Sequence, residues 1–367
     1  MSVLRAVLTP AATVSLLLGW IGVVALMVFS DAIGAAEPLI TWLALAAVVA
    51  VILVAAFGVV AQAEALAHKL GDPYGSLILT ISIVLVEVIL IASVLLGPGE
   101  HATIARDSVM AVTMIILGLV VGVSLLIAPR RESIVNRPGT TSYLVMIIAL
   151  AAIAFVVPFF LPAGTYTGPL AFIVAAVAIV GYGLFLVRQM GPRAADYREN
   201  DAATDEHRDV RDVVRNHGAE LWARTLLLIA TAVPIVIMSH DMSTLMDTAF
   251  TEAGAPLALS GVVIAFIVFT PETITTLRAA RAGEVQRVVN LCLGALVSTV
   301  GLTIPVVLVI GEVTGSTITL APDATQLLLM IAMVLATILA FWGGKTTRAR
   351  GVVPVLLFAA YFALITL

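Results

Sequence analysis

Two glutamates lie inside apolar runs that are long enough to cross a lipid bilayer. Residues 77–96 contain one charged residue, Glu87, and residues 256–276 contain one, Glu272. A charged side chain at the centre of a membrane helix costs about 2.5–3.5 kcal/mol on insertion scales, so such residues usually have a function. The two acids are 185 residues apart, about half of the chain. Buried acids at matching places in two halves predict an ion pathway built from internal repeats.

Hydroxyl groups near these acids, or on neighbouring spans, are candidate secondary ligands or cavity-lining groups. They are Ser82, Thr113, Thr270, Thr273, Ser298 and Thr299. Pro271 removes a helix hydrogen bond beside Glu272 and frees a carbonyl about one turn earlier. Each hydroxyl has an alternative role, in which it only bonds a carbonyl of its own helix. Glu272 has an alternative too, because Arg278 is near enough in sequence for both to be snorkelling surface residues.

Other titratable residues follow the ends of apolar runs. Glu64 and His68 are a candidate gate or proton access point, and an interfacial acid is the equal alternative. His240 and Asp241 are expected at the outer end of a span, where a neutral His beside an Asp can relay protons. A satisfied interfacial pair is the alternative there. The remaining acids at outer helix ends are expected to be solvated; they are Asp31, Glu37 and Glu312.

The composition is that of an all-α polytopic membrane protein. Of 367 residues, 61% are hydrophobic and 11% are charged, which is far more apolar than a soluble domain needs. The single cysteine, Cys292, excludes an internal disulfide and a cysteine-based metal site. Gly343–Thr346 imitates the end of a phosphate-binding loop, but the motif needs a glycine where Leu339 stands inside an apolar run. The sequence therefore predicts no ATP-driven pump and no enzyme.

Eleven spans are predicted, and the basic residues set their orientation. The spans cover 11–29, 39–60, 77–96, 109–128, 142–161, 169–187, 225–246, 257–276, 289–310, 324–342 and 353–367. The N-terminus and every second loop hold 18 of the 19 Lys and Arg residues, and Arg106 is the exception. The positive-inside rule then places the N-terminus in the cytoplasm and the C-terminus outside. An alternative for the first span is a cleaved signal peptide.

Spans 2–6 and 7–11 form two predicted five-helix repeats. Because five is odd, the second repeat enters the membrane inverted, as in many secondary transporters. The predicted organisation is an extra N-terminal helix (1–38), a first repeat (39–188), a charged cytoplasmic loop (189–224) and the inverted second repeat (225–367). Ala111 and Gly118 correspond to Gly294 and Gly301 as small residues two turns apart. They serve either close helix packing or a cavity lining.

Two segments, 63–91 and 269–311, resemble the calcium/cation antiporter superfamily, specifically its cation/proton exchanger branch and the bacterial ChaA-type sodium–calcium/proton antiporters. The second segment is the more specific, with Gly294 22 residues after Glu272 and Pro305 eleven residues later. The resemblance implies that Glu87 and Glu272 bind the transported cation and exchange it for protons. It also implies that spans 2 and 7 move against spans 3, 4, 8 and 9. The charged loop 191–220 is expected to be a solvated linker or an exposed helix. A regulatory cation site there is an alternative, since related antiporters carry acidic loops at this position.

The sequence departs from the wider branch at the residues that precede each acid. That branch usually has Gly-Asn there, whereas this chain has Ile83–Val84 and Val268–Phe269. Two amide ligands are therefore missing. A Ca²⁺ ion takes about six to eight oxygen ligands, and two carboxylates supply at most four. Backbone carbonyls, hydroxyls and water would have to supply the others.

The predicted function is a cation/proton antiporter that expels Ca²⁺, Na⁺ or K⁺ from a bacterial cell across the inner membrane. Its partners are the lipid bilayer, small inorganic cations and protons; no cofactor and no nucleic acid is expected, and the oligomeric state is open. A monovalent antiporter without Ca²⁺ transport is the main alternative. A cation channel with an acidic selectivity ring is a second alternative. An intramembrane hydrolase should show paired aspartates with activating neighbours, which the sequence does not contain.

Overall fold

The computed structural model describes residues 7–34, 37–71, 74–96, 102–129, 132–191, 193–197, 210–256 and 258–366. Within these ranges, eleven helices are long and apolar enough to cross a membrane, which confirms the predicted number of spans. The chain divides into two compact units, described separately below. Unit 1 comprises Met1–Gly99 and Ala203–Leu257, and unit 2 comprises Glu100–Ala202 and Ala258–Leu367. Each unit takes helices from both predicted repeats, and the repeats themselves remain a prediction.

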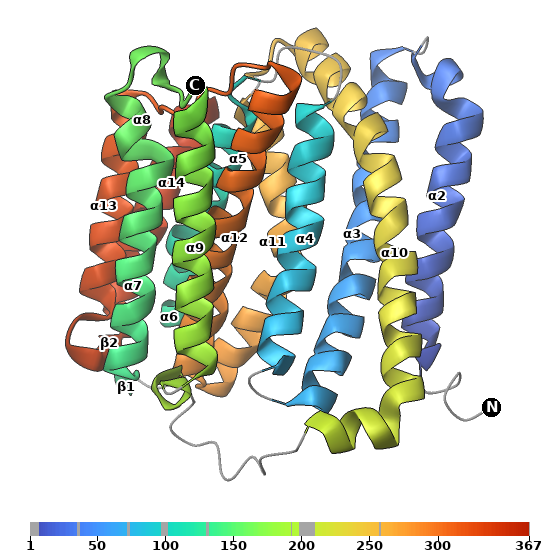
Figure 1. The fold of residues 1–367 in the computed structure, drawn as a ribbon. Helices are drawn as coiled ribbons and strands as arrows, with labels where there is room; N and C mark the ends of the chain where they lie inside the picture. Colours follow the sequence, from blue (N-terminus) through green and yellow to red (C-terminus); the bar gives the residue numbers. More distant parts are fainter. Residues whose placement is uncertain are drawn as a thin grey trace. The chain divides into compact units, whose positions relative to one another are not determined.

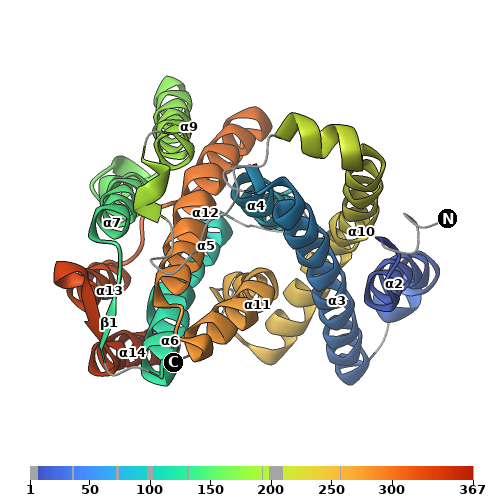
Figure 2. The ribbon, with the colours of Figure 1, turned by 90° about the horizontal axis from the view of Figure 1, so that it is seen from below.

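Unit 1 contains four long helices: α2 (Pro10–Gly34), α3 (Pro38–Leu70), α4 (Tyr74–Leu95) and α10 (Val210–Ala253). Helix α3 contacts the other three (Figure 2). It starts with Pro38, whose fixed φ suits the first turn, and it stops at Gly71, which has a positive φ of 68°. Small residues bring α2 close to its neighbours, since a Cβ at Gly58 would lie 2.6 Å from Ser15.

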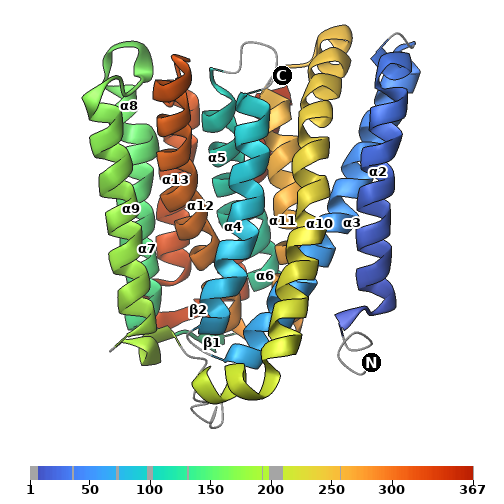
Figure 3. The same ribbon diagram turned by 45° about the vertical axis from the view of Figure 1, so that its right-hand side comes forward.

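Helices α3 and α10 extend beyond the predicted spans at the same end of unit 1 (Figure 3). The extension is held by an ion-pair network, in which Glu220 contacts Lys69 at 2.6 Å and Arg224 at 3.0 Å. Arg224 also donates to the buried Gln62. Beside this network lies an apolar cluster of Leu66, Leu70, Val213 and Leu221. Hydropathy detects the bilayer-spanning part of a helix, whereas these polar ends are stabilised by each other.

Helix α10 reaches into both of the loops that flank the predicted span 225–246. Residues 210–224 are helical, as in the helical alternative for this segment, and the helix continues after the span to Ala253. At the start of the predicted loop, η4 (Ala194–Tyr197) docks on unit 2, where Tyr197 is buried against the ring of Tyr143. Residues 198–209, the centre of the candidate regulatory loop, lie outside the described residues.

Unit 2 contains the remaining seven spans. The first is continuous through α5 (Ile104–Met114), a π-helical turn η1 (Ile115–Val120) and α6 (Val121–Ile127). The second joins α7 (Arg137–Ala151), a second π turn η2 (Ala152–Val156) and α8 (Val157–Phe159). The others are α9 (Pro169–Met190), α11 (Ala258–Ala282), α12 (Val285–Thr314), α13 (Ala324–Ala340) and α14 (Val352–Thr366). The span from Ile104 to Ile127 and α12 are the most enclosed of the eleven.

The loops at one end of unit 2 are tied together. Strands β1 (Glu132–Ile134) and β2 (Lys345–Thr347) pair antiparallel, with Ile134 opposite Lys345 (Figure 1). Asn136 bonds Gln286 and the carbonyl of Ala195, which joins two further loops to the same end. These four loops are among those rich in Lys and Arg. The predicted topology, in which every second loop carries the Lys and Arg residues, places these four loops on the same side of the membrane.

The opposite end of unit 2 carries the single exception to the charge count. Arg106 forms an ion pair with Asp107 at 2.8 Å and donates to the carbonyl of Ala321. Asp107 is itself buried and accepts a bond from Thr103. The extended segment around Leu320 bonds the carbonyl of Gly164, so the loops at this end also share one side. The isolated arginine is therefore fully engaged by neighbouring groups.

Candidate functional site

Glu87 lies on the buried face of α4 in unit 1. Its side chain is 1% exposed, and Ile83, Leu90 and Val94 along the same face are buried as well. Ile81 and Leu85 form the exposed side of the helix. The acid therefore faces protein and not lipid. Such a placement makes ionisation costly unless a cation or polar groups compensate for the lost hydration.

The polar neighbours of Glu87 on its own helix are few. Ser82 is half-buried and five residues away, which places it about 140° around the helix from the acid. Thr80, also half-buried, is seven residues away, or about 10 Å along the axis. Ligands for a cation at Glu87 must therefore come mainly from outside α4.

Glu272 lies within α11 in unit 2, directly after Pro271, and the helix continues through the proline to Ala282. The side chain is half-buried, but its Oε2 atom is fully enclosed and has no hydrogen-bond partner among the described residues. Arg278, the partner in the alternative interpretation, is exposed. An enclosed carboxylate oxygen favours a buried acid over a snorkelling one.

The face of α11 that carries Glu272 packs against other helices of unit 2. At 100° per residue, Gly261 and Thr276 fall on the same side as the acid. A Cβ at Gly261 would lie 2.7 Å from the backbone nitrogen of Ser108, so α5 approaches closely here. Thr276 is buried and lies beside the thiol of Cys292 on α12. The acid therefore faces the side on which α5 and α12 lie.

Thr270 and Thr273 are placed differently on α11. Thr270 lies about 160° from Glu272 around the helix, and its hydroxyl donates to the carbonyl of Phe266 at 2.5 Å. This is the local bonding that was the alternative for each hydroxyl. Thr273 is half-buried and about 100° from the acid.

Helix α12 has two polar faces that point in opposite directions. On one face, Ser298 accepts a bond from the hydroxyl of Tyr182 on α9 at 3.0 Å and donates to the carbonyl of Gly294. Gly301 is on this face too, and a Cβ there would lie 3.1 Å from the Tyr182 ring. This close approach supports helix packing as the function of Gly301, whereas a Cβ at Gly294 would make only ordinary contact with Tyr143 at 3.5 Å. Ser298 is likewise directed towards α9.

The other face of α12 carries Cys292, Thr299 and Thr303, each at most 3% exposed. Spacings of seven and four residues keep these side chains on one side of the helix, the side on which Cys292 meets Thr276. The hydroxyl of Thr303 has no partner among the described residues. Sequence reasoning missed Thr303 and the position of Cys292, although this spacing was visible in the sequence.

Thr113, Gly118 and a further glycine four residues later, Gly122, belong to the span built from α5, η1 and α6. The hydroxyl of Thr113 is buried and donates to the carbonyl of Val109 at 2.8 Å. A Cβ at Gly118 would lie 2.8 Å from Phe358, and one at Gly122 would lie 2.9 Å from the carbonyl of Gly351. These glycines therefore allow close packing against the C-terminal span.

The candidate gate residues lie at the helix surfaces of unit 1. Glu64 and His68 are exposed on the polar extension of α3. His240 is exposed and Asp241 is half-buried, but both lie within α10, which continues to Ala253. Both therefore lie before the end of this helix, and their part in proton access stays a prediction.

The acids expected to be solvated differ from one another. Glu37 is exposed at the start of α3, and the side chain of Asp31 lies outside the described residues. Glu312 is half-buried, and its carboxylate accepts a bond from the backbone N–H of Gly168 at 2.8 Å. The prediction of solvation is thus wrong for Glu312. Within the described ranges, no three His, Cys, Asp or Glu side chains gather as a metal-binding group.

Comparison with known proteins decides the family. Residues 40–191 and 224–367 match the family described as "Sodium/calcium exchanger protein". The chain is a member of this exchanger family. It is 35% identical over 315 residues to the "Sodium-potassium/proton antiporter ChaA" of Escherichia coli K12, and the match covers 84% of this chain and 85% of that one. A "Putative ionic transporter y4hA" of Sinorhizobium fredii is 31% identical, with the same shares covered.

Solved structures of exchangers share the fold. An H⁺/Ca²⁺ exchanger, CAX, superposes with a TM-score of 0.70 at 15% identity and covers 96% of this chain and 89% of its own. Native YfkE gives a TM-score of 0.67 at 16% identity, with 96% and 99% covered. The resemblance to a cation antiporter is therefore confirmed, and this exchanger-family member is a polytopic membrane protein that is related to transporters and not to enzymes.

Proposed function

We propose that this exchanger-family member is a proton-coupled cation antiporter with Glu87 and Glu272 as its cation- and proton-binding residues. The observation that carries the proposal is one enclosed carboxylate within an apolar span of each half of the chain. Intramembrane acids of this kind mark ion and proton pathways. Both are carried on long helices, α4 and α11, that cross the predicted hydrocarbon region.

The proposed mechanism is competition between cation and proton for the same carboxylates. A carboxylate removed from water prefers its protonated form, and an arriving cation displaces the proton. Each carboxylate is compensated when it carries a cation or a proton, whereas a bare buried carboxylate is not. Reorientation without either ligand is therefore unfavourable, and this restriction couples the two fluxes.

The proposed direction and cargo follow from the orientation and from the related protein. With the Lys- and Arg-rich loops in the cytoplasm of a bacterial cell, inward proton flow drives cations out across the inner membrane. The E. coli relative is named for sodium and potassium, and the two Asn residues of the wider branch are absent here. We therefore place Na⁺ and K⁺ first and Ca²⁺ second.

The test is exchange by the purified full-length protein in liposomes with a trapped pH indicator. A pH gradient is imposed, and Na⁺, K⁺ or Ca²⁺ is added in turn at matched ionic strength. Proton movement that follows the addition of a cation supports the antiporter. Cation flux measured with isotope but without proton movement would instead establish the channel.

A further inference from the structure

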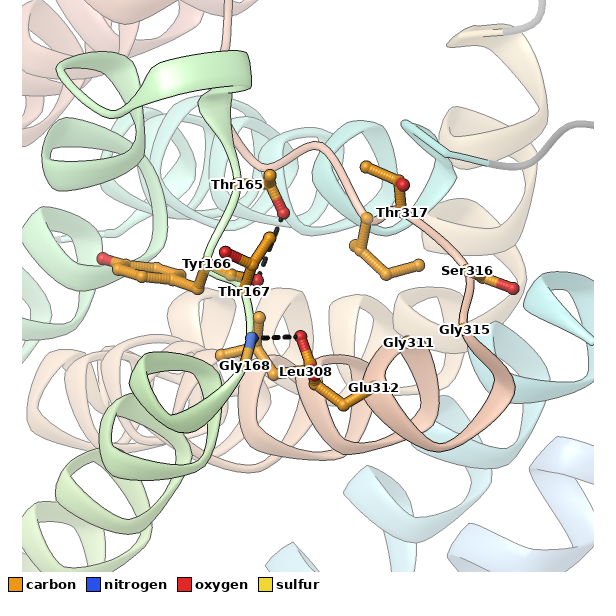
Figure 4. Close-up of a pocket in the computed structure, with 11 residues that line it drawn as sticks. Thr165, Tyr166, Thr167, Gly168, Leu308, Gly311, Glu312, Gly315, Ser316 and Thr317 are labelled. Carbon is orange, nitrogen blue, oxygen red and sulfur yellow. Dashed lines mark hydrogen bonds between the residues drawn. The ribbon is translucent and has the colours of Figure 1, made fainter.

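A polar cavity of about 230 Å³ lies in unit 2, remote in the sequence from both acids (Figure 4). It is bounded by the segment that leads into α9, by the last turns of α12 and by the chain that follows α12. The lining residues are Thr165, Tyr166, Thr167, Gly168, Leu308, Gly311, Glu312, Gly315, Ser316, Thr317 and Ile318. Glu312 is the single charged residue among them, and no Lys, Arg or His lines the cavity.

The walls of the cavity are held by a dense set of backbone contacts. Gly315 adopts a left-handed conformation, and its N–H caps the carbonyl of Gly311, which also accepts from Ser316. A Cβ at Gly311 would lie 2.6 Å from Ile318, so the chain folds back tightly over the helix end. The carbonyl of Gly164 accepts bonds from Leu320 and Ala321, which ties the second wall to the first. The cavity is thus preorganised.

The charge inside the cavity is unusual for its position. Glu312 lies in the last turn of the 30-residue α12, where the helix dipole and the terminal carbonyls are negative and an acid is unfavourable. One N–H, that of Gly168, partly compensates for it at 2.8 Å. In Figure 4 the carboxylate points from α12 towards the segment that carries Thr165 and Thr167. The carboxylate of Glu312 therefore shares the cavity lining with the hydroxyl residues Thr165, Thr167, Ser316 and Thr317, where negative potential is already present.

We propose that this cavity binds a hard inorganic cation through Glu312, and that it is a second cation site distinct from the transport acids. A site with several neutral oxygen ligands and one carboxylate suits a Ca²⁺ or Na⁺ ion that keeps part of its hydration shell. We expect weak binding, with a dissociation constant of about 10⁻⁴–10⁻³ M, as in extracellular Ca²⁺ sites. In the proposed orientation the site faces outside, on the side where cations are released.

Tyr166 supplies a specific reporter for the site. Tyr166 is one of the lining residues, and its hydroxyl donates to the carbonyl of Ile153 at 2.8 Å. Burial raises the pKa of Tyr166 to about 12, so the phenol stays neutral in ordinary buffers. Terbium(III) is a hard cation that binds Ca²⁺-type oxygen sites, and its luminescence is sensitised by a nearby tyrosine.

The experiment titrates Tb³⁺ into the purified full-length protein in detergent with tyrosine excitation. We expect saturable luminescence that Ca²⁺ displaces, at least a tenfold weaker response in Glu312→Gln, and loss of the signal in Tyr166→Phe. Gln can still accept the Gly168 N–H, so melting without cation shows that Glu312→Gln is folded. Glu252→Gln is the matched control, because Glu252 also lies in the last turn of a long helix but is exposed.

The outcomes separate this site from the transport site. The signal should persist in Glu87→Gln and Glu272→Gln, whether or not those variants transport. Equal luminescence in the wild type and Glu312→Gln would overturn the proposal. So would an equal loss in Glu252→Gln, since any acid at a helix end would then suffice.

Discussion

The two acid-bearing helices, α4 and α11, differ more than a repeat would suggest. Helix α4 surrounds Glu87 with aliphatic residues and carries no proline. Helix α11 has Pro271 beside its acid and Thr276 one turn later, against a polar stripe on α12. The comparison teaches that the two halves differ in the polarity of the helix around their acids. The helix that carries Glu87 is apolar around the acid, whereas the helix that carries Glu272 places a further hydroxyl, that of Thr276, on the same face as the acid.

The largest expected effect is the loss of exchange when either acid is neutralised. We expect Glu87→Gln and Glu272→Gln to reduce exchange to the level of empty liposomes, because a neutral amide neither releases a proton nor balances a cation. Gln retains the shape of the side chain, so melting temperatures in detergent should stay within a few degrees of the wild type. Wild-type transport by Glu272→Gln would refute a role for this acid in transport. Failure of both variants to fold would make the acids structural.

An intermediate effect should distinguish the two faces of α12. We expect Thr299→Val and Thr276→Val to raise the cation concentration for half-maximal exchange several-fold, since both hydroxyls lie on the faces nearest Glu272. Ser298→Ala and Thr270→Val are the matched controls and should change it less than twofold, because their hydroxyls bond α9 or their own helix. Concentration dependence in liposomes measures all four. The reverse ranking would mean that the helix faces are misassigned.

A structural prediction concerns the paired loops of unit 2. In a Cys292→Ser background, Ile134→Cys and Lys345→Cys should form a disulfide rapidly on mild oxidation, because directly opposed antiparallel residues have Cβ atoms about 4.5–5.5 Å apart. The offset pair Ile134→Cys and Thr347→Cys should react more slowly. Gel mobility with and without reductant gives the yield. Equal rates would contradict the register.

The same engineered cysteines test the proposed orientation. An impermeant thiol reagent should label position 134 in inside-out vesicles and not in intact cells. Labelling from the outside of intact cells would reverse the map and the direction of transport inferred from it.

The smallest expected effect is the pH dependence of an exposed ion pair. Lys345 lies 2.8 Å from Glu132; it lowers the pKa of that carboxyl, and Glu132 raises the pKa of Lys345. Because the pKa of Glu132 is lower in the folded state, its ionised form stabilises the fold at any pH above the pKa of the unfolded state. This stabilisation disappears as the pH falls through the pKa of the folded state. Because the pKa of Lys345 is higher in the folded state, its contribution to stability disappears as the pH rises through that folded-state pKa. We expect Glu132→Gln to lower the melting temperature slightly near pH 7 and to leave it unchanged at pH 3, where the carboxyl of the wild type is largely protonated. A difference between the two proteins that persists at pH 3 would show that the ion pair is not its cause.

Much of this architecture could be predicted from the sequence because the bilayer imposes a length on apolar runs. All eleven spans, the clustering of basic loops and the two acids were visible as composition and spacing. The ends of α3 and α10 were not, because Glu220, Lys69 and Arg224 stabilise those turns by contacts between helices. Likewise, Ser298 and Thr299 are adjacent in sequence, and only the packing of Tyr182 shows which of them faces α9.

The π turn η1 has a consequence for how this chain is compared with its relatives. A π turn accommodates one more residue than an α turn, so every residue after it is displaced by about 100° around the axis and about 1.5 Å along it. Gly122, which follows the π turn, lies against the backbone of Gly351. Deleting a single residue within 115–120 would turn a bulkier side chain towards the C-terminal span. A one-residue gap in an alignment of this span would therefore mark a change of helical register, and the glycines of α6 should shift position together with it.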